Sequence, residues 1–159
     1  MTISIGDKLP VSDLMEMTEK GPSKISTSEM FAGKKIALFA VPGAYTPTCS
    51  AKHLPGFVGN LDAFKGKGID EVICLSVNDP FVMAAWGKAQ EAASVRMVAD
   101  PDAAFTKAMN LEFDASGAGL GIRSRRYSMV VDNGIVSQLN LEETGGFEVS
   151  DAETLLGQL

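Results

Sequence analysis

The chain has 159 residues, of which 45% are hydrophobic, and a formal net charge of −6 at pH 7. This length and apolar content exclude a disordered chain and predict one domain over residues 1–159. The acidic balance argues against a nucleic-acid partner, and no apolar run approaches the roughly 20 residues of a membrane-spanning helix. Because residues 1–8 lack a basic stretch followed by an apolar core, we see no signal peptide and expect a cytoplasmic protein.

The first third of the chain predicts one edge strand, one short helix and one buried strand. Residues 11–18 alternate weakly between apolar and polar side chains, which predicts the edge strand, and Gly21-Pro22 predicts a turn after it. Residues 27–33 resemble a short capped helix that ends at a glycine. The apolar run within 35–41 predicts a strand buried in a sheet.

A loop with one cysteine follows this strand and reads PGAYTPTCS over residues 42–50. Cys49 is expected in the first turn of the next helix, where free backbone N–H groups and the helix dipole favour a thiolate. Thr46 lies three residues earlier, so its hydroxyl can reach the sulfur across one turn. Pro42 and Pro47 stiffen the loop and remove two N–H donors. Together these residues predict a rigid pocket around a reactive thiolate.

The middle of the chain continues the alternation of helices and strands. The helix after Cys49 should run to about Lys65, with a kink or break at Pro55-Gly56. The continuous apolar run in 70–77 suits a central strand that is buried on both faces. A helix over 80–92 should follow, with Asp79 as its N-cap.

The last third predicts a hairpin and a terminal helix. The expected elements are a strand at 95–99, a helix from Asp100-Pro101 to about Met109, an irregular glycine-rich stretch at 111–125, strands at 127–132 and 135–140 around Asn133-Gly134, and a helix at 151–158. Strands that alternate with helices predict an α/β fold with helices on both faces. A β-α-β unit followed by an antiparallel hairpin and a last helix matches the thioredoxin-like fold, a central mixed β-sheet flanked by helices.

Three blocks of the sequence resemble type II peroxiredoxins. They are the Pro42-x-x-x-Thr46-x-x-Cys49 motif with the HLPGF string after it, SVNDPFVM at 76–83, and GIRSRRYSM at 121–129. The resemblance covers nearly the whole chain. It implies the thioredoxin-like fold and a thiol peroxidase, an antioxidant enzyme that reduces hydrogen peroxide and organic hydroperoxides.

The resemblance also implies a mechanism and its residues. The Cys49 thiolate attacks a peroxide oxygen and becomes a sulfenic acid, while Thr46 hydrogen-bonds the sulfur and the peroxide. No metal or organic cofactor is needed, because the sulfur itself carries the electrons. The family places an arginine just before the strand at 127–132, beside the cysteine. The resemblance therefore implies that Arg126 is the cationic partner of Cys49. The residues alone do not choose among the three arginines, and we assign Arg123 and Arg125 to a solvated basic rim.

The second cysteine leaves two routes for reducing the sulfenic acid. Cys74 lies in the most apolar strand, which is typical of an inert buried cysteine. Some type II peroxiredoxins carry a cysteine at this place that has been proposed to form a disulfide with the oxidised cysteine. If Cys74 is structural, an external thiol must act instead, either glutathione with glutaredoxin or thioredoxin. Family members commonly pair, so a homodimer is expected.

Competing interpretations rest on weaker patterns. His53 lies four residues after Cys49, so a Cys–His hydrolase is conceivable, although packing is its expected role. A Cys-x-x-Cys exchange motif is excluded because Thr46 occupies its first position. The glycines of 117–121 lack phosphate-loop spacing and indicate a flexible loop. A redox-sensing or interaction module without turnover is the alternative of another class.

Overall fold

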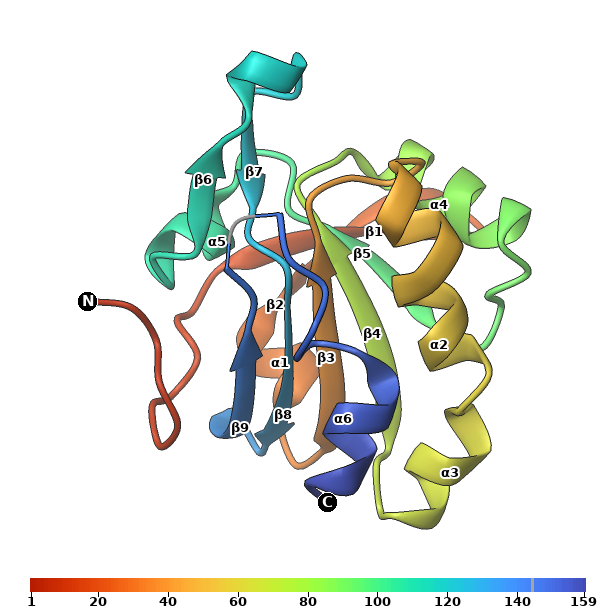
Figure 1. Cartoon of the computed structure of the whole chain (residues 1–159), viewed down its shortest axis with the longest axis vertical. Helices are drawn as coiled ribbons and strands as arrows, with labels where there is room; N and C mark the ends of the chain where they lie inside the picture. Colours follow the sequence, from red (N-terminus) through yellow and green to blue (C-terminus); the bar gives the residue numbers. More distant parts are fainter. Residues whose placement is uncertain (144) are drawn as a thin grey trace.

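The protein is built around one seven-stranded mixed sheet (Figure 1). The computed structural model describes residues 1–143 and 145–159. The strand order is β2-β1-β5-β4-β3-β8-β9. The strands are β1 (Asp13–Thr18), β2 (Gly21–Ser26), β3 (Lys35–Val41), β4 (Glu71–Ser76), β5 (Arg96–Ala99), β8 (Tyr127–Asp132) and β9 (Ile135–Leu141). The central strands β3, β4 and β5 are parallel, whereas β1, β8 and β9 add antiparallel pairs, which confirms the expected thioredoxin-like α/β sheet.

Helices cover both faces of the sheet, which separates two hydrophobic cores. One face packs against α1 (Thr27–Phe31) and α5 (Ala104–Ala108). The other packs against the π-helix η1 (Cys49–His53), α2 (Leu54–Val58), α3 (Leu61–Gly66), α4 (Pro80–Ala89) and α6 (Ala152–Gly157). Successive residues of β3 point to opposite faces, so Leu38 joins the first core and Phe39 the second. This two-sided burial explains the continuous apolar sequence of β3 and β4.

The strand predicted at 11–18 is not at the edge of the sheet. The unpredicted strand β2 pairs antiparallel with β1 and takes the edge position, so the chain turns at 19–20 rather than at Gly21-Pro22. Its sequence, GPSKIS, has one large apolar residue, Ile25, which packs against the first core. An edge strand tolerates Pro22 because one side of its backbone has no partner strand.

A second, two-stranded ribbon occupies the stretch predicted to be irregular. Strand β6 (Glu112–Asp114) pairs antiparallel with β7 (Ile122–Ser124), and the short 3-10 helix η2 (Ser116–Ala118) lies between them. The ribbon projects beyond the main sheet at the top left of Figure 1, on the side of α5. It is too short to show a clear alternation in the sequence. Its importance for the site is that it carries Arg123.

Several helix boundaries differ from prediction for local reasons. Pro55 lies inside a helical segment that runs on from the π-helical turn at Cys49–His53, and this segment breaks at Gly59-Asn60 rather than at Pro55-Gly56. Helix α4 ends at Ala89, three residues earlier than predicted. Helix α5 starts only at Ala104, because the buried Asp100 carboxylate accepts hydrogen bonds from later residues of this segment.

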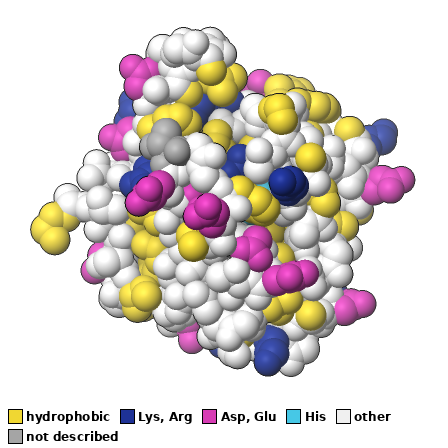
Figure 2. Space-filling view, viewed as in Figure 1, with side chains coloured by type: hydrophobic (Ala, Val, Ile, Leu, Met, Phe, Trp, Pro, Cys, Tyr) yellow, Lys and Arg dark blue, Asp and Glu magenta, His cyan; other side chains and the backbone are white. Residues whose placement is uncertain are grey.

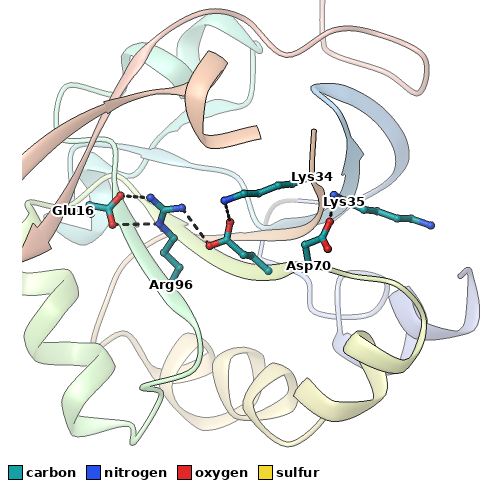
Figure 3. A network of polar contacts seen from close by, with 6 residues as sticks. Glu16, Lys34, Lys35, Asp70 and Arg96 are labelled. Carbon is teal, nitrogen blue, oxygen red and sulfur yellow. Dashed lines mark hydrogen bonds and ion pairs between the residues drawn. The ribbon is translucent and has the colours of Figure 1, made fainter. Parts of the chain in front are cut away.

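Ion pairs link side chains of neighbouring strands (Figure 3). Arg96 of β5 pairs with Glu16 of β1 and with Glu71 of β4, and Lys34 also pairs with Glu71. These side chains are partly exposed, so each pair contributes about 0–1 kcal/mol to stability. Among the described residues, no helix has the length and apolar character needed to cross a membrane.

Candidate active site

The cysteine loop connects β3 to η1 and is fixed at several points. Pro47 opens the helical segment, and the carbonyl of Thr46 accepts a hydrogen bond from the N–H of Ser50 at 3.0 Å. The N–H of Ala44 donates to Asn78 Oδ1 at 3.0 Å, which ties the loop to the residues after β4. Tyr45 has a φ of 67°, a left-handed conformation that costs about 1 kcal/mol or more in a residue with a side chain.

Cys49 begins the π-helical turn η1. Its carbonyl accepts from the N–H of Leu54, five residues later, so the turn is wider than an α-helical one. Cys49 itself is fully buried. The next residue, Ser50, accepts a hydrogen bond from the indole N–H of Trp86 at 3.0 Å, and this bond ties η1 to α4.

Thr46 contacts the sulfur directly. Its hydroxyl oxygen lies 2.8 Å from Cys49 Sγ and 2.7 Å from the carbonyl oxygen of Gly43. A hydroxyl has one hydrogen, so it can donate to only one of these two acceptors at a time. When the sulfur is a thiolate, it is the stronger acceptor because it is charged. Thr46 is therefore placed to stabilise a negative sulfur.

Arg126, the residue before β8, bridges the sulfur and a histidine. Its Nη2 donates to Cys49 Sγ at 3.2 Å, and its Nη1 lies 2.8 Å from His53 Nδ1. The guanidinium carbon also lies 5.8 Å from the centre of the Phe147 ring. The planar guanidinium group thus contacts both Cys49 and His53, the first and last residues of η1.

His53 is fully buried and uses both ring nitrogens. Its Nε2 lies 3.0 Å from the carbonyl oxygen of Ser150, which can only accept, so Nε2 carries the hydrogen and Nδ1 accepts from Arg126. Burial, and then the charge of Arg126, lower the pKa of His53 from 6.5 to about 3. The free lone pair thus faces Arg126 rather than Cys49, which removes the geometric basis for a Cys–His hydrolase. The sequence suggested packing for His53 but missed its contact with Arg126.

Arg123 and Arg125 do not form a solvated rim, contrary to our expectation. Arg123 donates to the carbonyl of Leu120 at 2.9 Å and to that of Pro42 at 3.2 Å, so it ties the β6–β7 ribbon to the cysteine loop. Arg125 donates to the carbonyl of Glu142 at 2.8 Å. Among the described residues, only Arg126 of the three is hydrogen-bonded to the sulfur.

A pocket of about 300 Å³ lies next to the buried Cys49 and is lined by the two residues that donate to its sulfur. Thr46 and Arg126, the two donors to Cys49, line it together with Pro42. Phe113 and Leu120 of the ribbon region add apolar surface. At the ribbon end of the molecule, apolar and basic side chains lie close together on the surface (Figure 2). The pocket therefore offers a polar base for a reacting group and apolar walls for an organic substituent.

Cys74 lies on β4, opposite Phe39 of β3, in the same hydrophobic core as Cys49. Both cysteines are free thiols in this structure. Burial, and then the nearby Cys49, raise the pKa of Cys74 well above its ordinary value. Cys74 is thus held as a neutral thiol, which is a poor nucleophile.

The chain resembles known proteins over nearly its whole length. The Redoxin family model matches residues 4–156. Peroxiredoxin-2D of Arabidopsis thaliana is 48% identical over 159 residues, covering 99% of this chain and 98% of the relative. The chloroplastic Peroxiredoxin-2E of the same plant is 47% identical over 163 residues, covering 99% and 70%. A crystal structure of reduced Prx3 from Vibrio vulnificus in complex with hydrogen peroxide has 52% identity and a TM-score of 0.96, covering 99% of each chain.

Proposed function

The chain belongs to the redoxin family as a type II peroxiredoxin, a thiol-dependent peroxidase that acts on hydroperoxides, and we propose that Cys49 is its peroxidatic residue. The observation that carries this proposal is the position of Cys49 Sγ, which receives hydrogen bonds from Thr46 and Arg126, two residues that line the pocket. The similar Vibrio vulnificus protein was crystallised with hydrogen peroxide, which agrees with a peroxide in this pocket.

The proposed reaction is a displacement at oxygen. The Cys49 thiolate attacks the terminal oxygen of a hydroperoxide, an S–O bond forms, and the O–O bond breaks. The leaving oxygen takes a proton and departs as water or an alcohol, and the sulfur remains as a sulfenic acid. Arg126 stabilises the charge that moves from the sulfur to the leaving oxygen. Thr46 directs the attacked oxygen, and Pro42 lines the pocket without an N–H that would compete for it.

Peroxide consumption tests this proposal. Reduced wild type with an external thiol should consume many equivalents of hydrogen peroxide, and Cys49→Ser should consume none. A redox-sensing module without turnover would consume one equivalent and stop, even with reductant in excess. Turnover by Cys49→Ser at the wild-type rate would refute the assignment of Cys49.

We propose that an external thiol, glutathione with glutaredoxin or thioredoxin, reduces the sulfenic acid. The buried, neutral thiol of Cys74 supports this route over an internal disulfide. One external thiol condenses with the sulfenic acid and releases water, and a second thiol then releases Cys49. Because Cys49 is fully buried, η1 must open locally to admit the external thiol. Turnover by Cys74→Ser that matches wild type would support this route, and its loss in a folded variant would make Cys74 the resolving residue.

We further propose a homodimer, one domain over residues 1–159 and a cytoplasmic location. Two exposed aromatic side chains, Tyr45 (57%) and Phe81 (63%), offer apolar surface that pairing would bury. Sedimentation of wild type and Phe81→Asp would test it, with dissociation of the variant expected. A chloroplastic relative exists, so imaging of the tagged full-length protein in its own cells is the test of location.

A further inference from the structure

The carboxylate of Glu142 accepts several hydrogen bonds from the segment between β9 and α6. Glu142 Oε2 accepts the N–H groups of Glu148 (2.8 Å), Val149 (2.9 Å) and Ser150 (2.8 Å), and also the Ser150 hydroxyl (2.7 Å). Its Oε1 accepts the N–H of Glu148 as well, at 3.0 Å. Glu142 is 3% exposed. Several backbone donors that face one charged, buried acceptor fix residues 148–150 firmly.

The fixed segment contacts the arginine–histidine pair in two ways. The carbonyl of Ser150 accepts the hydrogen on His53 Nε2 at 3.0 Å. The Phe147 ring packs edge-on against the His53 ring, with centroids 5.1 Å apart, and lies beside Arg126. The backbone N–H of Glu142 also donates to the carbonyl of Arg126 at 3.0 Å. Glu142 therefore contacts Arg126 through its backbone and positions His53 through Ser150.

The Ser150 carbonyl and the Arg126 guanidinium together fix which nitrogen of His53 carries the hydrogen. With the carbonyl in place, Nε2 donates to it and Nδ1 must accept from Arg126. If the carbonyl moved away, the hydrogen could move to Nδ1 and face the N–H of Arg126. Two donors would then oppose each other in a buried site, and the guanidinium would shift from Cys49.

We propose that Glu142 is a positioning residue for the peroxidase reaction, which acts through Ser150 and His53 to hold Arg126 against Cys49. The inference rests on the proposed function, because it assigns Arg126 to the reaction. It adds a carboxylate that makes no hydrogen bond to the sulfur but fixes, through the Ser150 carbonyl, the tautomer of the histidine that contacts Arg126.

The charge state of Glu142 agrees with this role. Burial opposes the charged form, but the hydrogen bonds from Glu148, Ser150 and Val149 outweigh it and hold the pKa of Glu142 below its ordinary value. The carboxylate is therefore ionised at neutral pH, when the peroxidase acts.

The test compares Glu142→Gln with wild type by two independent measurements. His53 is the only histidine, so ¹⁵N NMR of the imidazole reads its tautomer without assignment. Wild type should show hydrogen on Nε2 only, and Glu142→Gln should show a mixture. The rate constant for the first oxidation of Cys49 by hydrogen peroxide should fall roughly 10- to 100-fold, as expected for a displaced group at a reacting centre. Glu153→Gln, an exposed charge loss on α6, is the matched control and should behave as wild type.

A wild-type tautomer or a wild-type rate in folded Glu142→Gln would overturn the proposal. If that variant does not fold, Ser150→Ala decides, because it removes one of the hydrogen bonds and leaves the backbone intact. Ser150→Ala should show a partial tautomer mixture and a several-fold slower oxidation, and no change in either would overturn the proposal. If wild type consumed no peroxide, the proposed function would fail, while the tautomer comparison would still support or overturn the link from Glu142 to His53.

Discussion

Arg126 offers the most direct test of how the site stabilises charge. Replacement by Gln removes the guanidinium from Cys49 Sγ and from His53 Nδ1. A hydrogen bond to a charged group contributes about 1.5–3 kcal/mol, and each 1.36 kcal/mol is a factor of ten in rate. The rate constant for the first oxidation of Cys49 should therefore fall roughly 10- to 150-fold. Arg126→Lys keeps the charge but lacks the planar fork that reaches both partners, so its loss should be smaller, about tenfold.

The assay for Arg126 is a single turnover of reduced protein with hydrogen peroxide, so that the external reductant does not limit the rate. The matched control is Lys52→Gln, which removes an exposed positive charge from the same π-helical turn. It should stay within about twofold of wild type, since exposed charges are screened. Circular dichroism establishes that each variant is folded. A folded Arg126→Gln with the wild-type rate would refute the view that this contact stabilises the reaction.

Four further outcomes follow from contacts at the same site. Thr46→Val should slow oxidation roughly 10- to 100-fold, whereas Thr46→Ser should retain most of the rate, because only the hydroxyl contacts the sulfur. Cys74→Ala should lower the free energy of unfolding by about 1 kcal/mol and keep turnover with glutathione, as checked by urea denaturation and peroxide loss. The pKa of His53 is about 3 in the folded protein and 6.5 in the unfolded one. Between pH 3 and pH 6.5 the unfolded state therefore binds one more proton than the folded state. The free energy of unfolding should then drop by about 2 kcal/mol from pH 7 to pH 5, and an imidazole that titrates near 6.5 in the folded protein would contradict this. Gly43→Ala would place a methyl group 2.7 Å from Arg123 Nη1, so the arginine must move, and we expect a loss of about 1–3 kcal/mol in thermal unfolding.

The sequence predicted those parts of the fold where one local signal is strong. Strands β3 and β4 have continuous apolar runs, and Asp79 caps α4 by accepting the N–H of Val82 at 2.8 Å. The β8–β9 turn has Asn133 and Gly134 at φ of 49° and 81°, as an Asn-Gly hairpin requires. Strands β2, β6 and β7 escaped prediction because pairing with neighbours, not a local pattern, makes them strands.

The site was predictable where residues lie close together in the chain. The spacing of Thr46 and Cys49 predicted their contact, since one helical turn separates them. The choice of Arg126 needed the family resemblance, because three arginines lie within four positions. Glu142 left no signal, because its partners are mostly backbone N–H groups that any sequence provides.

The hydrogen bond between Trp86 and Ser50 makes Trp86 an intrinsic fluorescent probe of the π-helical turn. Trp86 is the only tryptophan in the chain, and its indole is buried against the turn that begins at Cys49. Opening of that turn breaks the indole hydrogen bond and admits water, which changes fluorescence intensity and emission maximum. The same fluorophore therefore reports in real time when the oxidised sulfur becomes accessible, without a label and without a second tryptophan in the background.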